Sequence, residues 1–360
     1  MKVLIAGGAG FIGSTIASAA IDAGYQPVIL DNLVTGRREF CAGRVFYEGD
    51  ICDGTLVDRI FAEHPDIAAV VHCAALIVVP DSVRRPTQYY RENVAKTLEF
   101  VDRLVRNGVE RLIFSSSAAI YQPGADFRVD ETSPIQAISP YARTKVVAEE
   151  MLADITASSS LRVLSLRYFN PIGADPKMRT GLQIPTPSHA LGKVIEAHQT
   201  GTPFRVTGLD YPTRDGTGIR DYVHVWDLAE AHLRALDRFP RLFDATGDRH
   251  LVINLGTGTG TTVLELVQAF NGVVDRPVAV EHAPRRPGDT AGAFTGSARA
   301  RRLLGWRPRH SLAEGIADSL TWFEVRGRVL PDLAGAPAAT HAPAAPGATR
   351  EPAVSAATGG

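Results

Sequence analysis

The sequence predicts an α/β protein with a doubly wound parallel sheet and a smaller C-terminal substrate lobe. Over the first 170 residues, short runs of β-branched and aliphatic residues alternate with amphipathic stretches of helical spacing. The short runs are almost entirely apolar, as expected for parallel strands covered by helices on both faces. A glycine-rich turn, "GGAGFIG" (7–13), directly follows the first run. In folds of this class, ligands bind at the carboxyl ends of the strands.

The first domain is expected to cover residues 1–170, with contributions from about 220–256. Its strands are predicted, in order, at 2–6, 26–30, 44–49, 68–73, 111–116 and 161–166. Amphipathic helices are predicted between them at 12–23, 54–62, 88–106 and 140–157. We therefore expect a regular alternation of strand and helix, which places successive strands side by side and parallel.

The pattern changes after residue 170. Residues 171–219 are irregular and rich in Gly and Pro, and ordered segments return with "HLVINLGTG" (250–258). We expect 171–219 and 257–325 to form the substrate-binding lobe. Residues 333–360 are mostly Ala, Gly and Pro, which cannot bury enough surface to offset their ordering entropy, so a disordered tail is expected there.

Composition narrows the possible functions and locations. The net charge of -1 and pI near 6.8 give no indication of a nucleic-acid partner or a membrane surface. Three cysteines, Cys41, Cys52 and Cys73, argue against a disulfide framework and favour a reducing compartment. No apolar run is long enough to span a membrane. We therefore expect a cytoplasmic protein, and no metal site.

The glycine-rich turn predicts a dinucleotide site. Gly7, Gly10 and Gly13 lie between a strand and a helix, where glycines let a pyrophosphate approach the helix N-terminus. Asp31 ends the second strand, where a carboxylate can bind ribose hydroxyls and would repel a 2′-phosphate. The predicted cofactor is therefore NAD rather than NADP.

Further candidates for the cofactor site lie in the turn itself and at the neighbouring strand ends. Asp50 ends the third strand, where adenine would lie, and the small residues of "CAAL" (73–76) allow close backbone approach at the fourth. The set of additional candidate cofactor contacts is Phe11, Ile12, Asn32, Asp50, Ile51, Ala74, Ala75 and Ser115.

A candidate reacting centre combines "FSSSAAIY" (114–121) with "SPYARTK" (139–145). Ser139 and Pro140 suit the N-cap and first position of a helix. Tyr141 and Lys145 are then an i, i+4 pair on one face, and a nearby ammonium favours the phenolate. Ser117, at the end of the fifth strand, completes a group able to move a proton beside a nicotinamide.

These motifs together carry a resemblance to a known family. From residue 1 to about 325 the chain resembles the extended short-chain dehydrogenases/reductases, and within them the UDP-glucose (UDP-galactose) 4-epimerases. The motifs that carry the resemblance are "GGAGFIGS", "SPYARTK", "LRYFNPIGA" (166–174), "DYPTRDGTGIRDYVHVWDLAEAH" (210–232), "NLGTGTG" (254–260) and "RRPGD" (285–289).

The resemblance implies a tightly held NAD that is reduced and reoxidised in each turnover. Tyr141 would take the proton of the sugar 4-hydroxyl as hydride leaves C4, and Ser117 would bond the same oxygen. Lys145 would hold the nicotinamide ribose and, with the positive nicotinamide ring, keep the tyrosine acidic. Phe169 would pack near the nicotinamide, and Asn93 would lie near Ser117.

The resemblance also implies a UDP-sugar substrate. Arg220 and Arg286 match the family's diphosphate-binding arginines. Ala293 falls where the family places the side chain beside the sugar C2 substituent, and a small residue there implies acceptance of UDP-N-acetylglucosamine and UDP-N-acetylgalactosamine. The same motifs supply three further candidate substrate contacts, Asn170, Tyr222 and Asp289.

The chain departs from the family pattern in three places. Ile77 stands where a lysine is usual, so one cofactor phosphate contact is missing or replaced. "TPSHAL" (186–191) replaces an Asn-Asn pair, with Ser188 or His189 as possible substitutes. Gln122-Pro123 replaces the glycine usual near the sugar.

Two other functions compete with 4-epimerisation. A sugar-nucleotide 4,6-dehydratase shares the Tyr/Lys pair but typically needs an Asp-Glu pair beside the serine, and "SSSAAIY" has none. A non-catalytic NAD-sensing regulator would not need an intact Ser117, Tyr141 and Lys145. The family commonly forms homodimers through two helices, which here would be 88–106 and 140–157.

Overall fold

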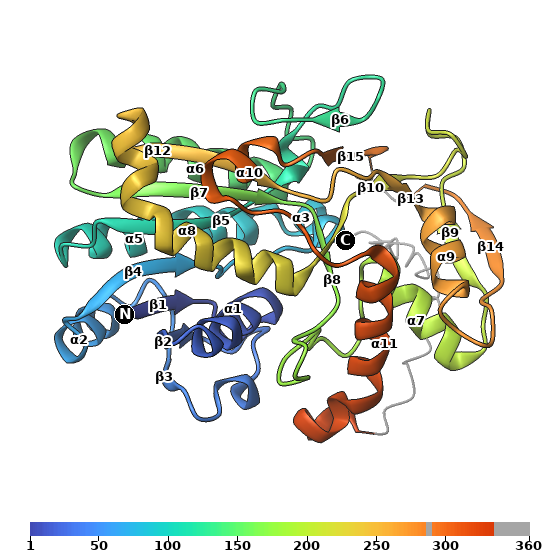
Figure 1. Ribbon diagram of the computed structural model, residues 1–360, viewed down its shortest axis with the longest axis horizontal. Coiled ribbons are helices and arrows are strands. Elements are labelled where there is room, and N and C mark those ends of the chain that lie inside the picture. Colours follow the sequence, from blue (N-terminus) through green and yellow to red (C-terminus); the bar gives the residue numbers. More distant parts are fainter. Residues whose placement is uncertain (286–289, 335–360) are drawn as a thin grey trace, which may run out of the picture.

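The protein is described by a computed structural model that covers residues 1–285 and 290–334, apart from the side chains of residues 245 and 246. A parallel seven-stranded sheet, in the order β12-β7-β5-β4-β1-β2-β3, dominates one side of the molecule (Figure 1). Its strands are β1 (Lys2–Ala6), β2 (Gln26–Asp31), β3 (Val45–Glu48), β4 (Ile67–His72), β5 (Arg111–Ser117), β7 (Arg162–Tyr168) and β12 (His250–Leu255). The predicted doubly wound fold is confirmed.

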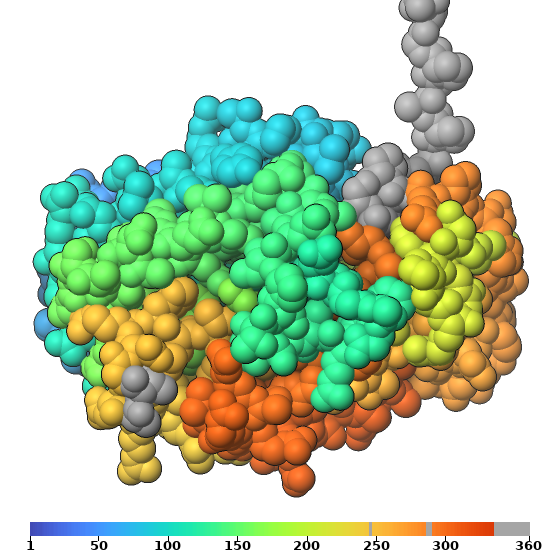
Figure 2. Space-filling view, turned by 90° about the horizontal axis from the view of Figure 1, so that it is seen from above, coloured from blue at the N-terminus to red at the C-terminus, as the bar shows by residue number. Residues whose placement is uncertain are grey.

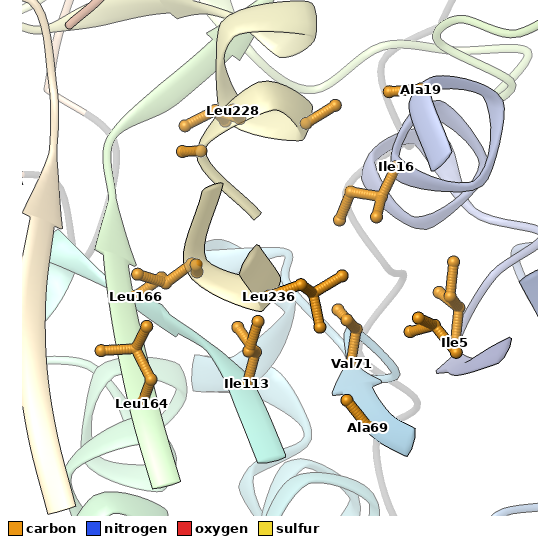
Figure 3. Packing of buried hydrophobic residues seen from close by; sticks show 14 of the residues in the cluster. Ile5, Ile16, Ala19, Ala69, Val71, Ile113, Leu164, Leu166, Leu228 and Leu236 are labelled. Carbon is orange, nitrogen blue, oxygen red and sulfur yellow. The ribbon is translucent and has the colours of Figure 1, made fainter. Parts of the chain in front are cut away.

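Helices cover both faces of the sheet. On one face α1 (Phe11–Asp22) packs against α8 (Val225–Thr246), as Figure 3 shows for Ile16 and Leu236 above Ile113 on β5. On the other face a second apolar cluster joins the sheet to α2 (Gly54–Glu63), α5 (Lys96–Arg106) and α6 (Pro140–Ser158). Because both faces are buried, the central strands are mostly apolar, which is the pattern that identified them in the sequence, whereas the edge strand β3 is only partly buried.

A separate apolar core lies beyond the carboxyl ends of the strands. It joins the side chains of Phe204, Phe270 and Trp322 across elements that are far apart in the sequence, on the right of Figure 1. These elements are β8 (Asn170–Ile172), α7 (Ala190–Thr200), β9 (Phe204–Thr207), β11 (Tyr222–His224), α9 (Val263–Asn271), β14 (Val280–Ala283) and α11 (Leu312–Val329). A small mixed sheet connects this part to the first, with strands β13 (Thr261–Thr262), β10 (Ile219–Arg220), β15 (Gly292–Thr295) and β6 (Arg128–Val129).

Short helices complete the connections. The helix expected at 88–106 is interrupted by a single π-helical turn, η2, between α4 and α5. The remaining short segments are η1 (Arg38–Cys41), α3 (Val79–Arg84), α4 (Pro86–Tyr90), η2 (Arg91–Ala95), η3 (Ala118–Ile120), α10 (Ala298–Leu304) and η4 (Pro331–Leu333).

Two of the expected boundaries differ from the structure. We expected the segment that contains α10 in the substrate lobe, but Leu304 and Trp306 belong to the core of the large sheet. Trp306 packs beside α8, where its Nε1 donates to the Asp227 carbonyl at 2.8 Å. The expected tail also starts too early, since Leu333 is buried in η4 against the second core. The rest of that tail, 335–360, lies outside the described residues.

Two further findings bear on the expected class of protein. Cys41, Cys52 and Cys73 are all free. Within residues 1–285 and 290–334, no helix combines the length and the apolar character that crossing a membrane requires.

Candidate active site

The glycine-rich turn is shaped by close backbone packing. Gly7 has φ +79°, and a Cβ there would lie 2.5 Å from the Ala74 amide nitrogen, so only glycine fits. A Cβ on Gly13 would lie 2.2 Å from the Gly7 carbonyl oxygen. Gly10 differs, because a Cβ there would meet only the Gly7 carbonyl oxygen within 4 Å, and Gly10 caps α1 without any side-chain hydrogen bond. The open, uncapped helix N-terminus fits a pyrophosphate.

Asp31 lies beside this turn at the end of β2. Its carboxylate is buried and accepts hydrogen bonds from the backbone N–H groups of Ala9 (2.9 Å) and Leu33 (2.8 Å). Burial raises the pKa of Asp31, and the two backbone bonds oppose that effect. The arrangement fixes the carboxylate at the edge of the dinucleotide site.

The next strand end brings together Asp50, Asn32 and a residue that the sequence analysis missed, Lys96. The Asp50 carboxylate accepts from the Lys96 ammonium at 2.6 Å and from the Asn32 amide at 3.0 Å. Lys96 also pairs with Glu92 at 2.7 Å. One lysine therefore bridges both carboxylates at the predicted adenine end and offsets one of their two negative charges.

The candidate reacting centre assembles where α6 crosses the end of β5. Ser139 caps α6, its hydroxyl accepting from the Ala142 N–H at 3.1 Å, so Tyr141 lies in the first turn. The Ser117 side chain lies close enough to the Tyr141 phenol to lower its pKa. Lys145, one turn later, donates to the Ser115 carbonyl at 2.8 Å. All three predicted catalytic side chains, Ser117, Tyr141 and Lys145, are buried within this small region.

The electrostatics of this region differ from the expectation in one respect. The Lys145 ammonium is directed to the Ser115 carbonyl and lies 4.8 Å from the centre of the Phe114 ring. It is not among the groups that shift the pKa of the Tyr141 phenol. Burial raises the pKa of Tyr141, and only the Ser117 side chain lowers it. Burial also lowers the pKa of Lys145 to about 8. An acidic phenol therefore requires a further positive charge beside it.

Comparison with known proteins agrees with this geometry. The model of the NAD dependent epimerase/dehydratase family matches residues 3–253. The chain belongs to that family. Within it the chain is 41% identical over 324 residues to the UDP-glucose 4-epimerase of Azospirillum brasilense, covering 89% of this chain and 91% of that protein. It is 42% identical over 323 residues to the enzyme of the same name from Rhizobium leguminosarum bv. trifolii, covering 89% of this chain and 96% of that protein.

A solved structure extends the similarity to three dimensions. The UDP-glucose-4-epimerase of Stenotrophomonas maltophila, crystallised with NAD and formylated UDP-arabinopyranose, has a TM-score of 0.85 and 37% identity. The match covers 91% of this chain and 99% of that one. The resemblance inferred from the sequence motifs is confirmed over nearly the whole described structure.

The structure also gives the surroundings of other predicted cofactor contacts. Ile12 and Ile51 pack their side chains into the two apolar layers beside the sheet, so only their backbone is available to a cofactor. Ser115 donates to the Cys73 sulfur at 3.1 Å, and Phe169 is buried near Ala118. Phe11 instead lines a cavity at the junction of the two cores, with Pro171, Ile172, Gly173, Leu182, His189, Ile195, Ser319, Trp322 and Phe323.

Asn93 is hydrogen-bonded to the loop after β4 and to α6. Its amide donates to the Leu76 carbonyl (2.9 Å) and the Thr144 hydroxyl (3.1 Å), and its oxygen accepts from the Leu76 N–H (2.8 Å). Asn93 lies in the π-helical turn η2, a feature that is frequent at functional sites. It therefore ties α6 to the loop after β4.

The predicted substrate contacts gather around the small mixed sheet. The Arg220 guanidinium donates to the carbonyls of Ile219, Ala291 and Thr290. Asn170 pairs with Tyr222 across β8 and β11, and among the described residues the buried Tyr222 hydroxyl has no hydrogen-bond partner. Arg286 and Asp289 lie outside the described residues.

Ala293 lies between the two halves of the site. It pairs with Arg220 across β10 and β15, and its side chain packs on the cluster that contains Ala118 and Phe169. Phe294 points the other way, since its ring lies 2.6 Å from where a Gly260 Cβ would be.

The departures from the family pattern can also be located. Ile77 is 64% exposed in the loop after β4. His189 caps α7, where its Nδ1 accepts from the Gly192 N–H at 3.2 Å. Gln122 is exposed, and its backbone N–H donates to the Pro134 carbonyl at 2.9 Å.

Asp221 is another functional candidate that sequence reasoning missed. This fully buried carboxylate, between Arg220 and Tyr222, accepts from the backbone N–H groups of Thr257 (2.8 Å) and Thr295 (3.2 Å). It thereby holds two distant segments beside the predicted substrate contacts. Its position inside the quoted motif was a usable signal, but its partners could not be read from the spacing. Within the described residues, no group of three or more His, Cys, Asp or Glu side chains is placed to hold a metal ion.

Proposed function

We propose that the protein catalyses NAD-dependent 4-epimerisation of UDP-hexoses, interconverting UDP-glucose and UDP-galactose through a 4-keto sugar. The observation that carries this proposal is that the buried side chains of Ser117, Tyr141 and Lys145 gather where α6 meets the end of β5. Family membership and the similarity to UDP-glucose 4-epimerases support it.

The catalytic roles follow from the contacts of each side chain. The Tyr141 oxygen accepts the proton of the sugar 4-hydroxyl as hydride leaves C4, and it returns that proton when hydride is delivered to the other face. The Ser117 hydroxyl, which lies beside the phenol, orients the same sugar oxygen. Bound NAD supplies the hydride acceptor and donor, and its positive ring favours the phenolate. Lys145 holds the nicotinamide ribose.

The adenosine end of the site selects NAD. Asp31 is held by two backbone N–H groups, so it cannot turn away from a ligand at that edge. Its carboxylate would bind ribose hydroxyls and repel the 2′-phosphate of NADP.

The substrate diphosphate is assigned to Arg220, with Tyr222 and Asn170 beside it. A guanidinium is suited to a diphosphate because it presents several donors in a fixed plane. A phosphate oxygen would provide the partner that the buried Tyr222 hydroxyl lacks among the described residues. Arg286 and Asp289 remain proposed contacts on the strength of the motif.

The hexose then lies beside Ala293, between the diphosphate contacts and the reacting centre. A methyl group there leaves the space that an aromatic ring would fill, so we propose that UDP-N-acetylhexosamines are accepted as well. The side chain of Gln122, which could have closed this space, is exposed.

The direct test is turnover of UDP-galactose by the purified protein without added NAD. The proposal predicts UDP-glucose as product, measured by chromatography or proton NMR. Release of a 4-keto-6-deoxy sugar would identify a 4,6-dehydratase. Tight NAD binding without any turnover would identify a cofactor-sensing protein.

We also propose a homodimer formed through α5 and α6. Leu98 on α5 is 44% exposed and Val147 on α6 is 36% exposed, and Tyr90 adds a third apolar side chain on adjoining α4. Light scattering should give the mass of a dimer for the wild type and of a monomer for Leu98→Glu. Leu209→Glu, at a similarly exposed leucine in the other lobe, is the matched control and should remain a dimer. A monomeric wild type would contradict the proposal.

The cytoplasm is the proposed location, since thiols stay reduced there and all three cysteines are free. Cell fractionation is the direct measurement. Recovery of the protein in an extracellular or periplasmic fraction would contradict this location.

A further inference from the structure

A chain of buried polar contacts runs behind the reacting centre. The Ser116 hydroxyl donates to the Glu149 carboxylate, which also accepts from Arg167 Nε at 2.9 Å and 3.2 Å. The other end of the guanidinium donates to the Tyr121 hydroxyl at 2.8 Å, and that hydroxyl donates to the Asn254 side-chain oxygen at 2.7 Å. All five side chains are buried.

The segment 118–138 helps to shield this chain from solvent. In Figure 2 this teal segment spreads over the surface between green α6 and the orange-red residues around α10. Burying a carboxylate and a guanidinium carries a large desolvation penalty, and apolar residues of similar volume often stabilise a fold equally well. The ion pair between Glu149 and Arg167 therefore needs an explanation other than stability.

The contacts between α6 and β5 provide that explanation. Three successive residues of β5 each hold one residue of α6. The Ser115 carbonyl accepts from Lys145, the Ser116 hydroxyl donates to Glu149, and the Ser117 side chain lies beside the Tyr141 phenol. The three α6 residues are spaced by four, so they lie along one face of the helix. Glu149 is the one member of this face with no proposed contact to cofactor or substrate.

We propose that Glu149 is a positioning residue of the active site, whose carboxylate fixes the register of α6 on β5 and supplies a negative charge behind Lys145. The inference deepens the proposed 4-epimerase function and relies on it for its kinetic readout. Arg167, on β7, holds the carboxylate in place from the opposite side.

The charge of Glu149 matters because Lys145 is buried. Burial lowers the pKa of Lys145 to about 8, while Cys73, directly after β4, and Glu149 on α6 both oppose this effect. His72, the last residue of β4, is neutral at physiological pH because burial lowers its pKa to about 3. Tyr141 is the remaining titratable group on the same face of α6. Cys73 is protonated at neutral pH, since burial raises the pKa of its thiol to about 11. Glu149 is thus the anion that favours the ammonium form.

The direction of the pH effect follows. An ammonium is present below its pKa, so removing the nearby carboxylate should deplete the charged form at a lower pH than in the wild type. In Glu149→Gln, which keeps the shape and removes the charge, the alkaline limb of the kcat profile should move to lower pH. In Glu149→Asp, which keeps the charge and shortens the reach, that limb should stay in place.

The positioning role of Glu149 can be measured separately from the effect of its charge. Glu149→Asp and Ser116→Ala both weaken the tie between α6 and β5, and should lower kcat by about 10- to 100-fold with KM and NAD affinity near wild type. Ser116→Ala leaves the Glu149–Arg167 pair intact, so it tests the register even if Glu149→Gln fails to fold. Glu150→Gln removes a charge from the next, exposed residue of α6 and is the matched control, with wild-type kinetics expected.

A second measurement separates this inference from the proposed function. The pH dependence of amine labelling at Lys145, followed by peptide mass spectrometry, reports the ammonium form without any turnover. Glu149→Gln should shift this titration to lower pH, and Glu150→Gln should not. An inactive wild type with that shift would contradict the epimerase function alone. The positioning role would be overturned if Ser116→Ala had the kcat of the wild type and Glu149→Gln left the Lys145 titration unshifted. If Ser116→Ala is the only variant that can be purified, a kcat equal to that of the wild type overturns the role by itself.

Discussion

At the scale of single residues, burial determines the chemistry of the reacting centre. It disfavours the charged form of both proton-handling groups, raising the pKa of the Tyr141 phenol and lowering the pKa of the Lys145 ammonium. A buried phenol becomes a base only when a positive charge is brought beside it. The nicotinamide ring of oxidised NAD supplies such a charge, so the tyrosine is most acidic when the cofactor is ready to accept hydride.

The first residue-scale prediction removes the base. Tyr141→Phe should lower epimerisation by roughly 10²–10⁴-fold, since it deletes the group that takes the sugar proton. Bound NAD should be unchanged, because the ring still packs against the site. Steady-state turnover and the cofactor content of the purified variant check both statements. Turnover near the wild-type rate would eliminate the proposed role.

The second residue-scale prediction concerns the choice between NAD and NADP. Asp31→Ser should narrow the preference for NAD over NADP by about 10-fold or more, because it removes the fixed carboxylate that repels a 2′-phosphate. Binding of both dinucleotides by calorimetry measures the ratio. Equal affinity in the wild type would show that Asp31 does not discriminate.

At the scale of elements, α6 acts as a carrier of aligned functional groups. The Ser139 cap and Pro140 fix where the helix starts, which determines the positions of Tyr141 and Lys145 relative to β5. One helix thus places the proposed base Tyr141, the proposed ribose contact Lys145 and the buried Glu149 on a single face.

Replacing the ammonium on this helix tests its electrostatic role. In the NAD-bound enzyme, where the ribose would draw the ammonium from the Ser115 carbonyl toward the phenol, Lys145→Met should shift the activity profile to higher pH, because the phenolate then loses a favourable neighbouring charge. The rate at neutral pH should fall by about 10-fold or more. The test is a full pH–rate profile at saturating NAD. An unshifted profile with reduced cofactor affinity would restrict Lys145 to binding the ribose.

A further prediction concerns Ala293 on β15 and the range of UDP-sugars that the protein accepts. Ala293→Tyr should lower kcat/KM for the N-acetylated UDP-sugars by about 10-fold or more, since the ring refills the space beside the sugar. UDP-glucose and UDP-galactose should be affected much less. Rejection of N-acetylated substrates by both wild type and variant would show that another group closes the pocket.

Most of the large sheet was predictable from sequence, and the polar contacts were not. Strands buried on both faces are continuous apolar runs, so their positions were readable within a few residues. The register of Tyr141 and Lys145 on one helix face followed from spacing alone. The ion pair of Glu149 with Arg167 did not, because its partners come from separate strands and only the tertiary fold brings them together. The same holds for Lys96 beside Asp50.

At the scale of the whole molecule, two apolar cores meet around the proposed substrate site. The first holds the sheet and the cofactor elements, and the second holds α7, α9 and α11. The strands β10 and β15 join them, and carry Arg220 and Ala293 to the carboxyl edge of the sheet (Figure 1). Ala293, which pairs with Arg220, packs on the apolar cluster that contains Ala118 and Phe169. A cofactor held by the first core can then act repeatedly on substrates that enter beside the second.

The central claim is that hydride leaves C4 and returns to the same carbon on a retained cofactor. The most direct measurement uses UDP-galactose with deuterium at C4, incubated with the purified protein without added NAD. Proton NMR and mass spectrometry of the product should show UDP-glucose that keeps its deuterium at C4. Loss of the deuterium to solvent, or a requirement for added NAD with release of deuterated NADH, would contradict the account.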